Sequence, residues 1–465
     1  MLNIGYFDGL IKLTFKGINM QNLTARLKEL VEYAELNGVL MLAEEGNTIF
    51  HHASGYADRK NNRLLDGDSV FELASVSKPF TAIAVMILKE KGYLNFDDKV
   101  SDWLGDFPYE DVLIRHLLNH TSGLPEYMQL VMEQWDHEQI AENRDVLKLL
   151  IDYSPEVYFK PGEHWAYTNT NYVLLALIIE EVSGKTFANY MKEEIFSTLG
   201  MNDTFVFNAK YNHGIKNYAL GHVYDPSSDE YVRPDSFSDL AYVKYMGGIQ
   251  GDGAINSNAK DLLIFDQALY TEKLVSYSTL REAMSQTVLK GEEPIGYGLG
   301  WVIREIEETG MMVGHNGGWP GYSTCFCRFI DHNKTLIYLC NEEVDTEFEN
   351  RILQVATNIL FDLPYKFPEK PIRQKAVEIE LNECSKLEGT YHSPDEEGLL
   401  AKVFIENDHL YLQLSGQVKV ALHPLSITKF FIKNTSIEIN FSIQNEQVSH
   451  IYWEEEGETI VLNKI

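Results

Sequence analysis

The residues of this chain best placed to do chemistry together are Ser75 and Lys78, which lie three positions apart. If the segment after Ser75 is helical, positions i and i+3 share one face, and the lysine amine stands beside the serine hydroxyl. A hydroxyl is a weak nucleophile at its own pKa and becomes reactive when an adjacent base takes its proton. The pair therefore predicts a serine nucleophile activated by an amine.

The residues around the pair favour a helix over 75–91. The run 81–88 is almost entirely apolar, which is typical of a buried helix, and Gly92 is a suitable residue to end it. Pro79 is tolerated only in a first turn, so the helix should begin close to Ser75. The N–H groups at that helix end would favour negative charge developing near the serine.

The same spacing also occurs at two other places, Ser257/Lys260 and Ser426/Lys429. Ser257 fits the cap of a helix predicted over 258–270, and Ser426 lies in a stretch with strand character. A cap or a surface pair is thus the simpler interpretation of the spacing by itself. The hypothesis for Ser75 depends on what the rest of the chain supplies.

A tyrosine and an asparagine, Tyr167 and Asn169, precede an apolar helix predicted over 171–182. A phenol can shuttle a proton, and an amide can bind a substrate amide and steady a lysine. An aromatic residue at a helix entry is the structural alternative.

A third segment, Gly314-His315-Asn316-Gly317-Gly318, follows a predicted strand. Glycine weakens a strand interior, so paired glycines there indicate that another backbone, such as that of a substrate, approaches closely. The structural alternative is a hairpin with an isolated histidine.

In this order and at these separations, the three segments resemble the penicillin-recognising serine hydrolases. That group includes class C β-lactamases, DD-peptidases, D-aminopeptidases and related esterases, and its marks are Ser-x-x-Lys, Tyr-x-Asn and a Lys/His-x-Gly strand motif. The resemblance extends over about residues 30–362, with further matching segments at 71–75, 116–124, 160–163, 251–254 and 297–301.

The resemblance implies a role for each of these positions. Ser75 attacks a carbonyl and becomes acylated, while Lys78 and Tyr167 handle the proton, and the sequence leaves open which of the two is the base. Asn169 orients the substrate and the lysine.

The strand motif would complete the site that the resemblance implies. The N–H groups of Ser75 and Gly318 form an oxyanion hole, and Gly317 leaves room for the acyl chain. His315 stands where many β-lactamases carry lysine. A histidine is mostly neutral at pH 7, which favours the peptidase or esterase members over an efficient β-lactamase.

Composition limits the partners and the compartment. The chain has 465 residues with a formal net charge of -30, from 69 acidic and 39 basic residues, so nucleic acid and anionic membranes are not expected partners. No apolar stretch is long enough to span a bilayer, and the start shows no signal-peptide pattern. The four cysteines show no metal spacing and are best interpreted as reduced thiols. We therefore expect a cytoplasmic protein without metal or cofactor.

The order of predicted elements indicates two folded units. Predicted strands at 39–42, 47–51, 297–303, 311–314, 322–330 and 334–341, with helices between them, suggest an α/β sandwich whose antiparallel sheet takes strands from both ends, plus a helical region. Residues 376–465 instead form short alternating segments with turns about every ten positions, typical of a small β-barrel. This tail resembles the lipocalin-like C-terminal domains of some peptidase members.

We accordingly expect an N-terminal extension (1–20), a catalytic domain (21–362), a proline-rich linker (363–375) and the barrel (376–465), with the barrel shaping the substrate cleft. The leading functional hypothesis is a serine hydrolase that acts through an acyl-enzyme on a small amide, peptide (D-residues included) or ester. The alternatives are a catalytically silent binding or scaffold protein, and a weak β-lactamase or penicillin-binding protein.

Overall fold

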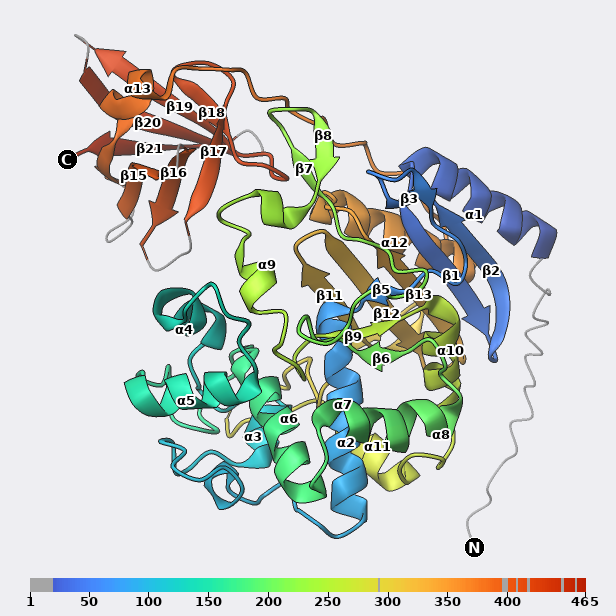
Figure 1. Ribbon diagram of the computed structural model, residues 1–465. Helices are drawn as coiled ribbons and strands as arrows, with labels where there is room; N and C mark the ends of the chain where they lie inside the picture. Colours follow the sequence, from blue (N-terminus) through green and yellow to red (C-terminus); the bar gives the residue numbers. More distant parts are fainter. Residues whose placement is uncertain are drawn as a thin grey trace, which may run out of the picture.

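The computed structural model describes residues 20–291, 293–394, 400–406, 409–415, 419–444, 447–455 and 458–465. The expected N-terminal extension lies outside these residues except for Met20, where the first helix begins. Figure 1 shows an α/β unit and a separate barrel, joined by an irregular segment between Leu360 and Leu381. We propose that the catalytic domain ends at residue 362 and that the barrel domain begins at residue 376, as expected from the sequence. Within the described residues, no helix combines the length and the apolar character needed to cross a membrane.

The α/β unit is built on one six-stranded antiparallel sheet, in the order β10-β11-β12-β13-β1-β2. Strands from both ends of the unit meet at its centre, where β1 pairs with β13, as the sequence predicts. The strands are β1 (Gly38–Glu44), β2 (Asn47–Ser54), β10 (Val302–Ile306), β11 (Gly310–Trp319), β12 (Tyr322–Phe329) and β13 (Lys334–Cys340).

Two of the predicted strands differ most from the structure in their bounds. The strand predicted over 297–303 begins only at Val302, because the glycines before it form turns and Gly300 has a φ of 86°. The strand predicted over 311–314 instead continues to Trp319. His315, Gly317 and Gly318 therefore lie within β11, paired with β12.

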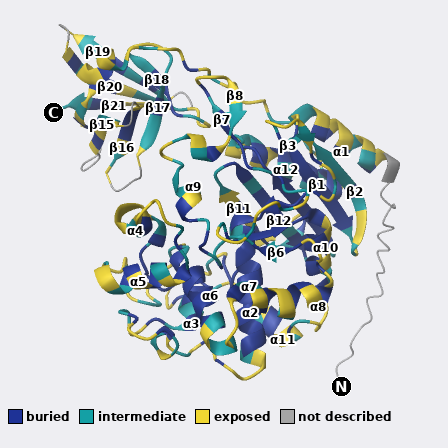
Figure 2. Cartoon of the chain, viewed as in Figure 1, coloured by how far each residue is buried: buried dark blue, intermediate teal, exposed yellow. Residues whose placement is uncertain are grey.

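Alternation along the strands divides the core into two layers. Leu40 and Leu42 of β1 face helices α1 (Met20–Ala34) and α12 (Thr346–Leu360), whereas Val39 and Met41 face the helical region on the other side. Successive side chains of a strand point to opposite faces, so one strand supplies both layers. Figure 2 shows the buried residues following the sheet and the helices next to it.

The remaining elements are mostly short. The helices of the helical region are α2 (Ser77–Glu90), α3 (Ile114–Leu118), α4 (Tyr127–Gln134), α5 (Asn143–Tyr153), α6 (Thr170–Ser183), α7 (Phe187–Met191), α8 (Ser197–Leu199), α9 (Tyr242–Tyr245), α10 (Ala259–Ala268) and α11 (Tyr277–Ala283). Single turns are η1 (Ala74–Val76), η2 (Val100–Asp102), η3 (Lys192–Phe196), η4 (Pro234–Ser236) and η5 (Ser385–Leu387). Small strands are β3 (Tyr56–Asp58), β4 (Arg63–Leu64), β5 (Phe71–Glu72), β6 (Phe205–Val206), β7 (Val223–Asp225), β8 (Glu230–Val232) and β9 (Ile255–Ser257).

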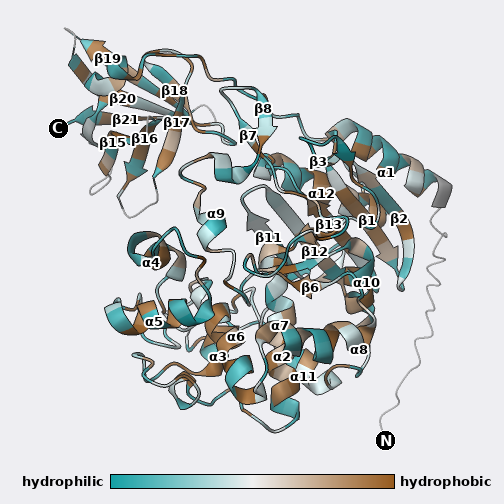
Figure 3. Ribbon diagram, in the orientation of Figure 1, coloured by the Kyte–Doolittle hydropathy of each residue, from teal (hydrophilic) through white to brown (hydrophobic). Residues whose placement is uncertain are grey.

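Two adjacent helices, α2 and α6, form the centre of the helical region. Residues 77–88 of α2 and 170–179 of α6 are all buried, and Figure 3 shows the largely apolar surface of both helices. Helices that are apolar all round must be enclosed by neighbours. Their N-terminal ends point toward the sheet, and the predicted catalytic residues lie at those ends.

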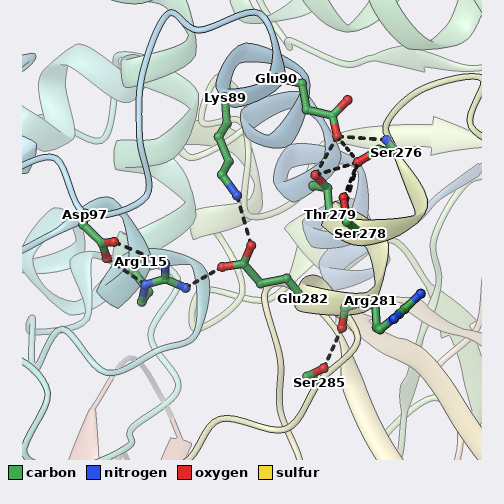
Figure 4. A network of polar contacts seen from close by, with 10 residues as sticks. All are labelled: Lys89, Glu90, Asp97, Arg115, Ser276, Ser278, Thr279, Arg281, Glu282 and Ser285. Atoms are coloured by element: carbon green, nitrogen blue, oxygen red, sulfur yellow. Dashed lines mark hydrogen bonds and ion pairs between the residues drawn. The ribbon is translucent and has the colours of Figure 1, made fainter.

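A network of charged groups ties the far end of α2 to its neighbours. Glu282 of α11 accepts from Lys89 of α2 at 3.0 Å and from Arg115 of α3 at 2.9 Å, and Arg115 also pairs with Asp97 at 2.8 Å (Figure 4). Three elements thus share one carboxylate–guanidinium cluster, which fixes the direction of α2.

The tail forms the predicted barrel, closed and antiparallel, with its strands in sequence order. The strands are β14 (Gly389–His392), β15 (Leu400–Glu406), β16 (His409–Leu414), β17 (Val420–Pro424), β18 (Lys429–Phe431), β19 (Glu438–Gln444), β20 (Gln447–Glu455) and β21 (Glu458–Lys464), preceded by α13 (Leu381–Cys384). Its interior is packed with side chains such as Tyr391, Phe430 and Phe441.

Lys433, which follows β18, is one of the barrel residues that contact the α/β unit. Its ammonium donates to the Tyr224 carbonyl at 3.0 Å, pairs with Glu343 at 2.9 Å and lies 5.5 Å from the ring centre of Phe237. The segment that carries Phe237 leads directly into α9. The barrel is therefore fastened to the segment that runs into α9.

We predict that Lys433→Met loosens this contact and speeds proteolysis of the segment 363–380, measured on gels against time. The half-buried ion pair and the carbonyl bond are both lost, while Lys419→Met removes an ion pair and a cation–π contact that both lie within the barrel, and serves as the control. Equal cleavage rates in the two variants would contradict this account.

Candidate active site

The three predicted catalytic groups meet at Ser75. Its Oγ lies 3.0 Å from Lys78 Nζ and 3.0 Å from the Tyr167 hydroxyl. The lysine comes from the first turn of α2, and the tyrosine comes from the loop that precedes α6. Residues that are 92 positions apart in the chain thus reach one hydroxyl.

Ser75 itself lies in the turn η1 rather than in α2, which begins two residues later. The helix predicted over 75–91 is thus correct for most of its length but wrong at its start. The reason is that this first turn is closed by an i to i+3 bond, from the Val76 N–H to the Leu73 carbonyl at 3.2 Å, and its Ala74 has a left-handed φ of 48°. The turn points Ser75 outward while Lys78 remains in the helix.

A buried carboxyl group holds that strained turn. Glu72 accepts from the main-chain N–H groups of Ala74 at 3.2 Å and Ala254 at 3.0 Å, and Asn256 donates to its other oxygen at 2.9 Å. Ala254 is left-handed too, with a φ of 70°. Burial raises the pKa of Glu72 to about 7 against the lowering effect of these bonds. One side chain thereby stabilises two strained residues beside the nucleophile.

The Lys78 amine is fully buried and is surrounded by oxygen atoms. Besides Ser75 Oγ, it lies 2.8 Å from Asn169 Oδ1 and 2.8 Å from the Asp252 carbonyl oxygen. It also lies over the ring of Tyr167, 4.9 Å from its centre. Each of these partners restricts where the amine can move.

Two carboxyl groups support this arrangement from behind. Glu126 accepts from both the main-chain N–H and the side-chain amide of Asn169, at 2.9 and 3.2 Å, which fixes Asn169 Oδ1 toward the lysine. Asp252 accepts from the Tyr127 hydroxyl at 3.0 Å. Burial raises the pKa of both carboxyl groups, and the Lys78 charge acts against that rise.

Tyr167 rests on a buried histidine. The ring of His120 lies 4.3 Å from the Tyr167 ring, and its Nδ1 receives the main-chain N–H of Thr168 at 3.3 Å. Burial and the nearby Lys78 charge hold the pKa of His120 well below its usual value. A neutral ring therefore supports the tyrosine, which is itself 38% exposed.

His315 lies behind the tyrosine and is only 5% exposed. Its Nδ1 is 2.6 Å from the Asn316 carbonyl oxygen, so that nitrogen carries the hydrogen, and its Nε2 is 3.1 Å from the Tyr297 hydroxyl. Burial, with a contribution from Lys78, lowers the pKa of His315 to about 3. The ring is therefore neutral at pH 7, in agreement with the expectation that no fixed cation stands there.

The paired glycines have different roles. A Cβ on Gly317 would lie 2.2 Å from the Leu73 carbonyl oxygen and 2.3 Å from Thr324 Oγ1, so this glycine lets β11 approach the turn that carries Ser75. A Cβ on Gly318 would meet no atom within 4 Å. Within this motif the open space therefore lies beside Gly318 and not beside Gly317, to which the family resemblance assigns room for an acyl chain.

A cavity of about 960 Å³ opens beside Ser75. Asn169, Asp252 and Gly318 line it next to the serine, and Trp319 and Tyr242 line it farther out. Much of its wall comes from residues 207–247, which form mostly irregular segments.

Sequence reasoning missed several residues of this site. Glu72 and Asp252 stand in segments that matched the related hydrolases, but nothing in the sequence gave them a role. Glu126 had no local signal, because its contact with Asn169 depends on two loops meeting.

Comparison with known proteins finds relatives over most of the chain. The family model described as beta-lactamase matches residues 23–358. Penicillin-binding protein 4* of Bacillus subtilis is 45% identical over 94% of this chain and 97% of its own length. A D-aminopeptidase of Brucella anthropi is 26% identical over 67% of this chain and 57% of its own. The crystal structure of a penicillin-binding protein from Bacillus halodurans, 26% identical, covers 72% of this chain and 98% of its own with a TM-score of 0.62.

We predict that substitutions of the two glycines differ in their effect on stability. Gly317→Ala forces the strand away from Leu73. It should lower the free energy of unfolding by about 1–3 kcal/mol, and the melting temperature with it. Gly318→Ala fills open space and should melt like the unchanged protein. Thermal unfolding followed by circular dichroism measures both, and equal melting temperatures would contradict the packing described.

A further prediction concerns the stability of the fold at acidic pH. The unfolded chain protonates His315 near its ordinary pKa of 6.5, whereas the folded protein does so only near pH 3. The folded state therefore binds fewer protons in this window, and stability falls as pH drops below 6.5, by up to about 1.4 kcal/mol per pH unit from this group. His315→Gln should flatten the decline between pH 6.5 and 4.5 in denaturant titrations. An unchanged slope would show that the histidine is not buried neutral.

Proposed function

This chain belongs to the beta-lactamase family and is a serine hydrolase, and we propose that it cleaves a small amide, peptide or ester through an acyl-enzyme on Ser75. The observation that carries the proposal is the position of Ser75 Oγ, 3.0 Å from both Lys78 Nζ and the Tyr167 hydroxyl. A nucleophile, a base and a second proton carrier are within reach of one another.

Lys78 is the base in this proposal. A neutral amine has two N–H bonds and one lone pair. The carbonyl oxygens of Asn169 and Asp252, each 2.8 Å away, can only accept, so they take the two N–H groups. The lone pair is then left for the Ser75 hydroxyl. As Oγ attacks the carbonyl carbon, its proton moves to Nζ, and the resulting ammonium has an oxygen acceptor for each hydrogen.

Tyr167 carries the proton to the leaving group. Its hydroxyl is within hydrogen-bond distance of Ser75 Oγ and, unlike Lys78, is partly exposed to the side from which a substrate arrives. When the tetrahedral intermediate collapses, the phenol protonates the departing nitrogen or oxygen and recovers a proton from Lys78. In deacylation the direction reverses, and water replaces the leaving group.

Developing negative charge on the carbonyl oxygen needs donors, and we assign this role to the main-chain N–H groups of Ser75 and Gly318. Such donors contribute about 3–4 kcal/mol each to the transition state. The close approach of β11 to η1, which Gly317 permits, supports the pairing of these two groups.

Among substrate classes, the proposal ranks short peptides first, including those with D-residues, followed by carboxylic esters and then β-lactams. The neutral His315 favours this order, because no fixed cation stands where β-lactamases hold a substrate carboxylate. The D-aminopeptidase among the relatives supports it as well. A catalytically silent scaffold is a weaker proposal, since Ser75, Lys78, Tyr167 and Asn169 are all in contact.

The barrel shapes the substrate cavity indirectly. Lys433 holds the segment beside Phe237, and the continuation of that segment through α9 lines the cavity. We therefore retain the expectation that the barrel influences substrate preference.

We predict that Ser75→Ala abolishes turnover of p-nitrophenyl acetate and of D-alanyl-p-nitroanilide, because no other group can be acylated. Ser426→Ala is a matched control, since Ser426 stands in an identical Ser-x-x-Lys spacing on the barrel. Turnover that survives in Ser75→Ala would refute the assignment.

We predict that the effect of Tyr167→Phe depends on the leaving group. A p-nitrophenolate departs without a proton, so the loss of kcat/KM should be about tenfold, whereas an alkyl ester or amide needs the proton and should lose about 100-fold or more. Lys78→Met should slow both substrate types about equally. Equal losses in Tyr167→Phe for both leaving groups would contradict the role given to the phenol.

A further inference from the structure

Two arginines stand in the cavity wall, Arg63 on β4 and Arg233 between β8 and η4. They are 170 positions apart in the chain, and the fold brings both to the same loop, 218–221. Nothing in the mechanism above uses either side chain.

Both guanidinium groups donate to main-chain carbonyl groups. Arg63 donates through Nη2 to the Tyr218 carbonyl, and Arg233 donates through Nη1 to the Gly221 carbonyl. Nη1 of Arg63 is buried without a hydrogen-bond partner. Within the described part of the chain, neither guanidinium forms an ion pair with a carboxylate. Carbonyl groups bring no net charge, so neither positive charge is neutralised by an ion pair among the described residues.

The other charged groups of the cavity wall are already engaged. Glu72 receives three hydrogen bonds, and burial raises its pKa to about 7. Asp252 is bonded by Tyr127, and Lys244 faces Asp235 at 3.5 Å. Outside the cavity, the charge of Arg63 contributes to lowering the pKa of Asp58, whose carboxylate accepts from Asn61. An excess of positive charge therefore remains at the arginines, in a chain whose net charge is -30.

The cavity extends on the acyl side of the reaction. Asn169 and Gly318 line it, whereas Tyr167, the group assigned to the leaving group, is not part of its lining. A substrate whose carbonyl is held at Ser75 thus directs its acyl portion toward the arginines. The exposed Arg233 can meet a ligand directly, and Arg63 adds its charge from behind.

We propose that Arg233, supported by Arg63, binds a carboxylate on the acyl portion of the substrate, so that the enzyme prefers acidic acyl donors. This inference rests on the proposed function, since it names the substrate class of the same site. A guanidinium offers a planar pair of donors that matches a carboxylate, and such charged bonds are stronger than neutral ones.

The test uses p-nitrophenyl half-esters of dicarboxylic acids from succinate to suberate. Each is paired with the same compound whose distal carboxylate is capped as a methyl ester, so that only the charge differs. The measured quantity is the ratio of kcat/KM for the acidic over the capped ester. We expect a ratio above one at one chain length, decreasing with added salt.

Variants then locate the preference. Arg233→Gln should lower the ratio about tenfold, the size typical of one charged contact, and Arg233→Lys should restore part of it. Arg281→Gln is the control, because Arg281, next to Glu282 on α11 (Figure 4), is exposed and does not line the cavity, and its loss changes the net charge equally. A ratio at or below one at every length, or a ratio unaltered in Arg233→Gln, would overturn the proposal.

Failure of the proposed function would look different. If neither ester of any pair were turned over, acylation of Ser75 would be refuted, and the carboxylate site would be decided by binding alone. Calorimetry of monomethyl adipate with the full-length protein serves this purpose. Affinity that weakens about tenfold in Arg233→Gln, but not in Arg281→Gln, supports the site, and equal affinity in all three proteins refutes it.

Discussion

The contact on which the rest of the site depends is the one between the buried Lys78 amine and its oxygen neighbours. An unpaired ammonium in a protein interior is costly, and a neutral amine there still needs acceptors for its hydrogens. Asn169 and Asp252 supply two acceptors at 2.8 Å, and Ser75 supplies the third partner at 3.0 Å. Each partner comes from a different part of the chain. The fold can be understood as the means of bringing α2, α6 and the loop before β9 to this one nitrogen.

The same requirement explains the strain and the buried carboxyl groups nearby. Ala74 and Ala254 adopt left-handed conformations that alanine avoids, and Glu72 bonds the N–H of each. Glu126 in turn fixes Asn169. A strained backbone conformation persists only where surrounding contacts hold it in place. Here the strained turn places Ser75 outside the helix, while Lys78 remains within it. The catalytic distances are thus set by residues that have no chemical role of their own.

The parts of the fold and the site that depend on local sequence pattern could be predicted from the sequence. Ser75 and Lys78 are neighbours by helical spacing, and the alternating segments of the tail predict the barrel strands. Other features depend on tertiary approach. Gly317 is required by the Leu73 carbonyl of a distant turn, and the predicted strand at 297–303 is shortened by turns at its glycines. Arg63 and Arg233 are ordinary surface residues by sequence, and only the fold brings them to one loop, where neither forms an ion pair with another described residue.

The central claim is that a covalent acyl group forms on the oxygen beside this lysine. Rapid quenching during turnover of a slow ester, followed by intact mass spectrometry and peptide mapping, measures it directly. The account predicts one acyl adduct per chain, located on Ser75, that appears before product release and then decays. Product formation with no adduct, or with an adduct on another residue, would contradict it.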